Sequence, residues 1–212
     1  MGSLRGKNFH GSIETIDALR QKYNTAGGRA VTKEHSRIEK HTRRFLALSP
    51  FLVIASSAND GLADASPRGE APGFVQVLDD QTIAIPDRPG NNRLDTLENI
   101  LANPEIGLIF FIPGVNETLR INGRAEIRDD ADLLQRFEVQ GKLPATVLVV
   151  HIQAIYLHCA KALMRSNLWH ADMLPDQRPI PSMGQMINDQ INSDAEVEPE
   201  TEMVERYRKT LY

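Results

Sequence analysis

Two arginines and the expected start of a helix lie close together in the stretch from Asp64 to Ile100. Arg68 lies on a short predicted strand, and after Pro86 a turn rich in Pro, Gly and Asn leads into a helix that we expect to open at Asn92 and Arg93. The connections are too short to separate these groups far. Backbone N–H groups at a helix N-terminus, next to guanidinium groups, bind anions. The stretch therefore predicts an anion site.

Arg93 gives the strongest argument for this site. With Asn92 as the cap and Asp95 three residues further on, as in a capping box, Arg93 falls in the first helical turn. A cation there opposes the helix macrodipole unless an anion binds beside it. The alternative is that Arg88 and Arg93 are solvated charges, while Asn91 and Asn92 serve only the turn and the cap.

Residues after the last predicted strand give weaker indications of chemistry. Lys161 and Arg165 are four apart on one face of a helical turn, so they either reach an anion or substrate together or are solvated. Trp169 is either a core or interface aromatic or the cover of a bound ring. Cys159, beside His158, is typical of a small buried hydrophobe, since no orienting acid lies nearby. We assign no catalytic residue, and no metal-binding motif occurs.

The composition bounds the class of protein. The 212 residues, 41% apolar and 25% charged, suit one soluble domain with extended ends. The net charge of −4 shows no basic excess for binding nucleic acid. A single cysteine excludes an intrachain disulfide and favours a reducing compartment. Without a secretory segment or a run long enough to span a bilayer, we expect a cytoplasmic protein that binds no membrane.

Short hairpin-linked strands are expected to position the predicted site. Asn59-Asp60-Gly61 and Asp79-Asp80 indicate hairpin turns, and residues 106–112 form an apolar run typical of a central strand. Residues 145–157 are strongly β-prone. About six antiparallel strands with such connections are best accommodated by a small closed or half-split barrel, which removes exposed edges. The predicted fold class is α+β, with a mainly antiparallel six-stranded split β-barrel and flanking helices at both ends.

Helices are expected to flank the barrel. Ser12 and Thr32 are expected to cap helices over 12–23 and 32–48, and Ser182 to cap one over 182–191. Three parts result. They are an N-terminal helical segment packing on the barrel at 1–48, the barrel domain at 49–170, and a C-terminal connector with helices at 171–212.

Several segments carry a likeness to a known family. Two of them are long and together quite specific, and they are followed by a shorter signature. The segments are Ser66-Pro67-Arg68-Gly69 with Pro72-Gly73-Phe74, then Pro86-Asp87-Arg88-Pro89-Gly90-Asn91-Asn92-Arg93, and then His158-Cys159-Ala160-Lys161 with Arg165-Ser166 and Trp169. With these residues the chain resembles, from about Phe45 to Trp169, the flavin-binding split-barrel proteins related to pyridoxamine 5′-phosphate oxidase. It is most similar to an uncharacterised bacterial branch of probable FMN-dependent enzymes.

The resemblance implies a homodimer with FMN bound in clefts at the subunit interface. It implies that Arg68 reaches the FMN phosphate and that Pro86 and Asp87 line the flavin. Asn91, Asn92 and Arg93 match the phosphate-clamping Ser-Arg-Lys turn of the oxidases, with Arg88 compensating for the missing basic residue. Thr118 falls near the polar residue that faces the flavin ring. Lys161, Arg165 and Trp169 complete the expected cofactor-binding set. The signature by which the oxidases hold pyridoxal phosphate is not found, so a vitamin B6 substrate is not implied.

Three functions of different classes follow. The preferred one is an FMN-dependent oxidoreductase acting on a small-molecule substrate, or accepting hydride from a nicotinamide donor. The second is a flavin carrier or sensor without turnover. The third is a split barrel that binds haem, for which His158 or His170 would be the axial ligand.

Overall fold

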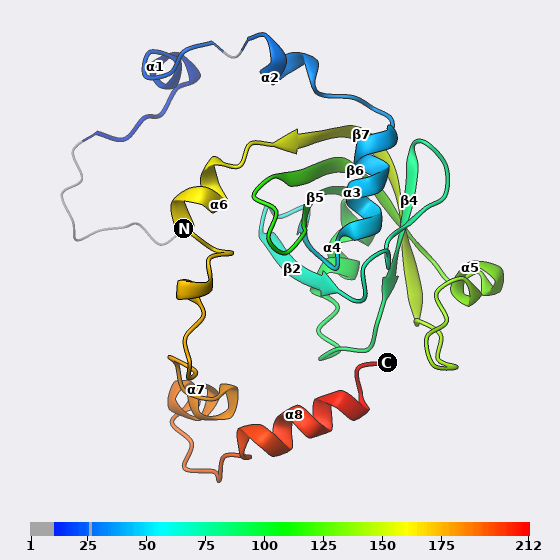
Figure 1. Ribbon diagram of the computed structural model, residues 1–212, viewed down its shortest axis with the longest axis vertical. Helices are drawn as coiled ribbons and strands as arrows, with labels where there is room; N and C mark the ends of the chain where they lie inside the picture. The colour runs from blue at the N-terminus through cyan, green and yellow to red at the C-terminus, as the bar shows by residue number, and fades with distance from the viewer. Residues whose placement is uncertain (1–10, 26) are drawn as a thin grey trace. The chain divides into compact units, whose positions relative to one another are not determined.

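The computed structural model describes residues 11–25 and 27–212 (Figure 1). Its elements, in chain order, are α1 (Ile16–Arg20), α2 (Arg29–Thr32), α3 (Lys40–Leu48), β1 (Phe51–Ser57), β2 (Ala63–Gly69), β3 (Gln76–Val77), β4 (Thr82–Asp87), α4 (Asp95–Ala102), β5 (Glu105–Phe111), β6 (Thr118–Arg128), α5 (Ala131–Gln135), β7 (Thr146–His158), α6 (Lys161–Ser166), the 3₁₀ helix η1 (Ala171–Met173), α7 (Met183–Ile191) and α8 (Glu200–Lys209). The predicted α+β class is confirmed, with seven strands rather than six because the two-residue β3 also pairs.

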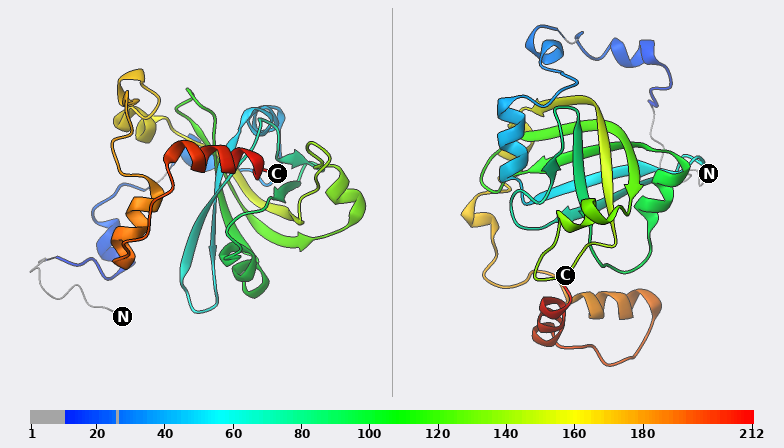
Figure 2. Two further views of the ribbon diagram at one scale, coloured as in Figure 1. Left: turned by 90° about the horizontal axis from the view of Figure 1, so that it is seen from below. Right: turned by 90° about the vertical axis from the view of Figure 1, so that its right-hand side faces the viewer.

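The strands form one sheet in which every pairing is antiparallel. Their order is β2-β1-β5-β6-β7-β4-β3. Four of the six pairings join strands that are consecutive in sequence, as hairpin connections predict. The sheet is strongly curled, as Figure 2 shows. This curl brings the β2 side of the sheet toward the end of β4.

The longest strands, β6 and β7, pair over their whole length with one irregularity. The register shifts between Asn122 and Gly123. A Cβ atom at Gly123 would collide with the carbonyl oxygen of His151 on β7. Glycine is therefore required where the two backbones approach each other most closely.

Alternate residues of the strands fill the inside of the curl. The most deeply buried side chains include Leu52, Ile54, Ile83, Ile85, Leu108, Phe110, Leu119, Ile121, Leu148 and Ile155. α4 closes this core with Ile100. A smaller cluster packs Phe137 and the partly buried Leu133 and Leu134 of the α5 region against Val147 and Val149. α5 therefore covers the outer face of β7.

Strand β2 departs from this apolar alternation. Its half-buried positions are Asp64, Ser66 and Arg68, whereas Ala65 and Pro67 are exposed. Glu70, which follows the strand, continues the half-buried series. A strand whose covered face is polar does not serve the core, so this face is available for a different use.

The N-terminal helices begin later than the caps predicted. α1 is capped by Thr15 rather than Ser12, and Thr32 ends α2 instead of starting a long helix. α3 begins after Glu39, whose carboxylate accepts hydrogen bonds from the backbone of His41 and Thr42. The single helix over 32–48 does not form because His35 exchanges two backbone hydrogen bonds with Ile155 of β7. The cap of α7 by Ser182 is confirmed.

The chain divides into two compact units, with the boundary between Glu34 and His35. The first contains α1 and α2. The second contains α3, the whole sheet and the C-terminal helices. None of the helices within the described residues is long and apolar enough to cross a bilayer.

Candidate functional site

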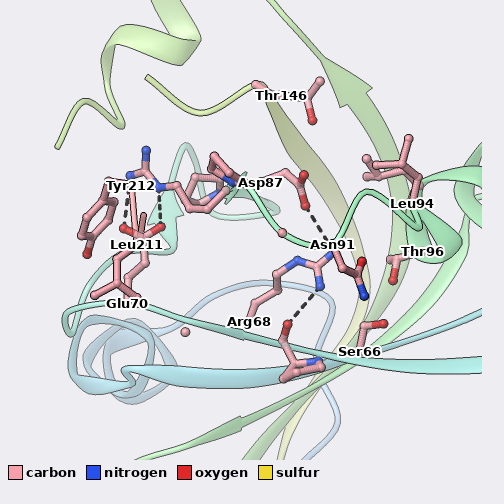
Figure 3. Close-up of a pocket in the computed structure, with 18 of the residues that line it drawn as sticks. Ser66, Arg68, Glu70, Asp87, Asn91, Leu94, Thr96, Thr146, Leu211 and Tyr212 are labelled. Atoms are coloured by element: carbon pink, nitrogen blue, oxygen red, sulfur yellow. Dashed lines mark hydrogen bonds and ion pairs between the residues drawn. The ribbon is translucent and has the colours of Figure 1, made fainter. Parts of the chain in front are cut away.

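A cavity of about 800 Å³ lies beside the polar face of β2 (Figure 3). It is bounded by β2, the end of β4, the 88–94 turn and the first turn of α4. Pockets for small molecules and cofactors usually have volumes of about 300–1,000 Å³. The lining residues are Ser66, Pro67, Arg68, Gly69, Glu70, Ala71, Phe74, Pro86, Asp87, Arg88, Pro89, Gly90, Asn91, Asn92, Leu94, Asp95, Thr96, Leu97, Ala145, Thr146, Leu211 and Tyr212.

Arg68 bridges the two strands that flank the cavity. Its Nη2 lies 3.2 Å from Oδ1 of Asp87, and its Nη1 donates a hydrogen bond of 2.9 Å to the carbonyl oxygen of Pro67 (Figure 3). The side chain of Arg68 is 22% exposed and that of Asp87 is 16% exposed. The guanidinium is thus held at the cavity wall while part of it remains accessible to a ligand.

Arg88 has a different environment. Its Nε and Nη2 form two hydrogen bonds to the carboxylate of Glu70, of 2.8 and 3.1 Å, and Nη2 also donates to the carbonyl oxygen of Phe137 at 2.7 Å. The side chains of Arg88 and Glu70 are only 12% and 9% exposed. Arg88 therefore braces the β2 end against the loop after α5. Its Nη1 has no hydrogen-bond partner among the described residues, and Arg88 lines the cavity. The expectation that Arg88 supplies the cation missing from the turn stays a prediction.

The predicted start of the α4 helix is wrong by two residues. α4 begins at Asp95 after Leu94, which takes the N-cap position in a left-handed conformation with φ 58°. Asn92 also has a positive φ, 59°, and the side chain of Asn91 accepts a hydrogen bond from the N–H of Arg93. This Asx-type turn redirects the chain before the helix starts, so no Asn92 capping box forms. Among the described residues, no side chain caps α4.

Arg93 consequently lies outside the helix. Its Nε donates to Oδ2 of Asp95 at 2.9 Å, and its side chain is 72% exposed. The hydrogen bond from Arg93 to Asp95 and the charge of that carboxylate raise the pKa of Arg93 above its ordinary value, with a further contribution from Asp64. The argument that Arg93 in the first turn requires an anion is therefore wrong, because Asp95 already balances its charge.

The first turn of α4 nevertheless lines the cavity with free backbone donors. Leu94, Asp95, Thr96 and Leu97 all contribute to its wall. The first N–H groups of a helix have no partner within the helix. An uncapped helix start and the guanidinium of Arg68 therefore share one cavity, which is the arrangement that favours an anionic ligand.

A hydroxyl–carboxylate network joins β2 to this turn. Oδ2 of Asp64 accepts hydrogen bonds of 2.9 Å from both Ser66 Oγ and Thr96 Oγ1. Asp64, Thr96 and Glu70 are not among the site residues predicted from the sequence, and Ser66 appears there only as part of a segment that carries the family likeness. The alternation of polar residues at positions 64, 66, 68 and 70 is a signal that identifies Asp64, Ser66 and Glu70, but no such signal identifies Thr96 on α4.

The sequence-predicted site residues divide into two groups. Arg68, Pro86, Asp87, Arg88, Asn91 and Asn92 all line the cavity, and Arg93 adjoins it between two lining residues. Thr118 is buried in β6, paired with His158 of β7. Lys161 and Arg165 lie exposed on α6, and Trp169 Nε1 donates to the carbonyl oxygen of Val115 at 2.9 Å.

Neither histidine suggested as a haem ligand lines this cavity. His158 lies at the end of β7, and its ring is 5.3 Å from that of Tyr156. His170 is exposed and lies 3.3 Å from the carboxylate of Asp172.

Two residues at the C-terminal end of the sequence, Leu211 and Tyr212, also line the cavity. The Tyr212 ring is 5.2 Å from the Arg88 guanidinium, and Lys142 Nζ donates to the Tyr212 carbonyl oxygen at 2.6 Å.

Comparison with known families and structures gives one family match. The model of the pyridoxamine 5′-phosphate oxidase family matches residues 38–159, more than half of the chain. The matched region runs from the segment before α3 to the end of β7, and it contains most of the cavity wall. No curated protein matches the chain.

The solved structures found by comparison share little sequence with this chain. HupZ of Group A Streptococcus is 17% identical, with 56% of this chain and 91% of that chain covered and a TM-score of 0.46. General stress protein 26 of Bacillus anthracis is 15% identical, covering 56% and 94%, with a TM-score of 0.41. The FAD binding protein of Mycobacterium smegmatis is 16% identical, covering 58% and 97%, with a TM-score of 0.41.

Proposed function

The chain belongs to the pyridoxamine 5′-phosphate oxidase family, and from this premise we propose that it is a flavin-binding split-barrel oxidoreductase whose cofactor is FMN. The observation that carries the choice of FMN is the shared cavity of Arg68 and the uncapped α4 start. A flavin with a terminal phosphate offers the anion that these donors favour.

The cavity residues suit this cofactor in size and chemistry. The cavity volume of about 800 Å³ lies in the range of cofactor pockets. Arg68 supplies a charged donor, and the first turn of α4 supplies backbone N–H groups. Asp87 holds Arg68 at the wall and competes with the phosphate for it, so binding of the phosphate requires Arg68 to share its donors. The ring would lie along the apolar part of the wall, which includes Phe74 and Pro86.

A bound flavin supplies the hydride chemistry, and the protein binds and orients it. Under this proposal the substrate is a small molecule or a nicotinamide donor. No side-chain acid or base is assigned, because hydride transfer to a flavin does not require one.

We extend the proposal to a homodimer in the cytoplasm. The region from α6 to the C-terminus exposes many large apolar side chains, which a second copy of the chain would cover. They are Met164, Leu168, Met173, Leu174, Ile180, Met183, Ile187, Ile191, Val204, Tyr207 and Leu211. Residues such as Lys161, Arg165 and Trp169, which lie away from the cavity of their own chain, would then be available to the flavin of the partner.

The first experiment is a visible absorption spectrum of the purified protein, before and after addition of FMN and dialysis. We expect flavin bands that survive dialysis, and oxidation of NADH or NADPH would then separate an enzyme from a carrier. A protein that stays colourless would contradict the proposal. A haem Soret band would instead favour the tetrapyrrole alternative.

The phosphate assignment is tested by Arg68→Ala. We expect the variant to lose about 1.5–3 kcal/mol of FMN binding free energy, the range for hydrogen bonds to charged groups. Its affinity for riboflavin, which has no phosphate, should stay unchanged. Isothermal titration with both flavins measures the difference, and Arg128→Ala, on an exposed arginine paired with Asp130, is the control. Equal FMN affinity in Arg68→Ala and wild type would rule out Arg68 as a phosphate ligand.

A further inference from the structure

Asp64 connects the two sources of donors that the proposed phosphate site needs. It lies at the start of β2 on the same side as Ser66 and Arg68. Its Oδ2 accepts the hydroxyl of Ser66 on its own strand and the hydroxyl of Thr96 on α4, both at 2.9 Å. Asp64 is itself outside the cavity wall, whereas Ser66, Arg68 and Thr96 are in it.

We propose that Asp64 is a positioning residue that fixes the first turn of α4 relative to Arg68 and thereby sets the preference for a phosphorylated flavin over riboflavin. This inference rests on the proposed function. It assigns Asp64 no contact with the ligand.

The location of Thr96 makes this connection effective. Thr96 is the second residue of α4, and it is only 3% exposed. Water therefore has little access to replace Asp64 as the partner of its hydroxyl, and an unpaired buried hydroxyl is costly. A shift of Asp64 moves the first turn of α4, whose residues line the cavity.

Other side chains hold the later turns of α4. Asn99 Nδ2 donates to Ser56 Oγ at 3.1 Å, and Asn103 Nδ2, just past the helix end, donates to Ser57 Oγ at 3.2 Å. These contacts fix the body of the helix on β1. The Asp64 contact acts at the first turn, where a small rotation changes the direction of the free N–H groups most. Asn103→Ala is therefore a matched control that loosens the same helix at its far end.

The network also determines which groups can donate to the ligand. Because both hydroxyls donate to Asp64, they present lone pairs, not hydrogens, to the cavity. The donors left for an anion on the β2 and α4 side of the cavity are Arg68 and the backbone of the α4 turn. Arg88 Nη1 and Thr146 Oγ1, which also belong to lining residues, have no hydrogen-bond partner among the described residues. The two hydroxyls that donate to Asp64 therefore contribute no donors to the ligand directly. Asp64 controls the preference for FMN over riboflavin through the position of the α4 turn.

Both hydrogen bonds end on the same oxygen, which allows geometry and charge to be separated. Asp64→Asn retains one carboxamide oxygen that can accept both hydroxyls, and it removes the negative charge. Asp64→Ala removes the acceptor as well. Thr96→Val keeps the volume and β-branched shape of Thr96 but removes the hydroxyl, so it breaks the network from the helix side.

The experiment is titration of FMN and riboflavin into the full chain in five forms: wild type, Asp64→Ala, Asp64→Asn, Thr96→Val and Asn103→Ala. We expect Asp64→Ala and Thr96→Val to raise the Kd for FMN on the order of tenfold, as loss of one good hydrogen bond would. The Kd for riboflavin should change less than twofold. Asp64→Asn should keep at least wild-type FMN affinity, and Asn103→Ala should leave the ratio of the two Kd values unchanged.

The outcomes distinguish the two proposals. Wild-type protein that binds neither flavin contradicts the proposed function, and this inference falls with it. Wild type that binds FMN, together with Asp64→Ala and Thr96→Val variants that retain the wild-type ratio, overturns only the positioning role. If Asp64→Ala does not fold, Thr96→Val and Asp64→Asn decide the question. An FMN loss in Asp64→Asn equal to that in Thr96→Val would assign the effect to charge and also overturn the inference.

Discussion

Arg68 and Arg88 line one cavity, but their immediate contacts give them different roles. Arg68 has a single carboxylate at 3.2 Å and stays partly accessible. Arg88 is held by both oxygens of Glu70 and by a backbone carbonyl. A motif in the sequence identifies both arginines equally well. The partners of Arg88 lie 18 and 49 positions away in the sequence, so the motif could not predict the burial and contacts of this side chain.

The brace between Arg88 and Glu70 predicts a large loss of stability when it is broken. Glu70→Gln leaves a guanidinium without its counter-charge in a site where the two side chains are 12% and 9% exposed. We expect the free energy of unfolding to fall by about 3–5 kcal/mol, the range for breaking a buried ion pair. Urea unfolding at pH 7 measures it. Asp130→Asn, which removes the partner of the exposed Arg128, should unfold like wild type, and equal stability of both variants would show that Arg88 is not a brace.

At the scale of elements, local signals predicted best where the local chain decides the structure. The Asn59-Asp60-Gly61 turn joins β1 and β2 as expected, with Gly61 at φ 81°. The β-prone run at 145–157 forms β7. One prediction failed because a distant contact decides the structure: the bridge between His35 and Ile155 prevents a helix over 32–48. Another failed because two local signals compete: the Asx turn at Asn91 prevails over the capping box at Asn92 and moves the α4 start to Asp95.

The pairing of β6 with β7 gives a prediction at the same scale. Gly123→Ala places a methyl group against the carbonyl oxygen of His151, so β6 must move or the register shift must change. We expect a loss of about 1–3 kcal/mol of unfolding free energy, as for overpacking. Gly107→Ala, where the nearest atom to the new Cβ is Asn122 Oδ1 at 3.6 Å, is the matched control and should retain stability. Chemical denaturation compares the two; equal loss in both would mean that the close approach at Gly123 is not what requires glycine.

At the scale of the whole molecule, the sequence predicted the fold class and the family but not the network inside the cavity. Hairpin turns and apolar runs are local features of the sequence, so they predict the strands and the pairing of consecutive strands. Asp64 and Thr96 are 32 residues apart, and their hydrogen bond exists because the curled sheet brings β2 against α4. Without the three-dimensional fold, Asp64 is one of many acidic residues in the chain.

Substitutions on the exposed apolar face of α7 test the proposed homodimer. Met183, Ile187 and Ile191 recur every four residues and are 51%, 45% and 65% exposed, so one helix face is apolar and uncovered within a single chain. We expect light scattering to give twice the chain mass of 23.7 kDa for wild type. Ile187→Glu combined with Ile191→Glu should lower the mass toward one chain, because a charge buried in an interface is costly. Gln185→Glu adds a charge on the opposite side of α7 and should leave the dimer intact. A wild-type protein that is monomeric at all concentrations would contradict the homodimer, and a dimer that survives both glutamates would place the interface elsewhere.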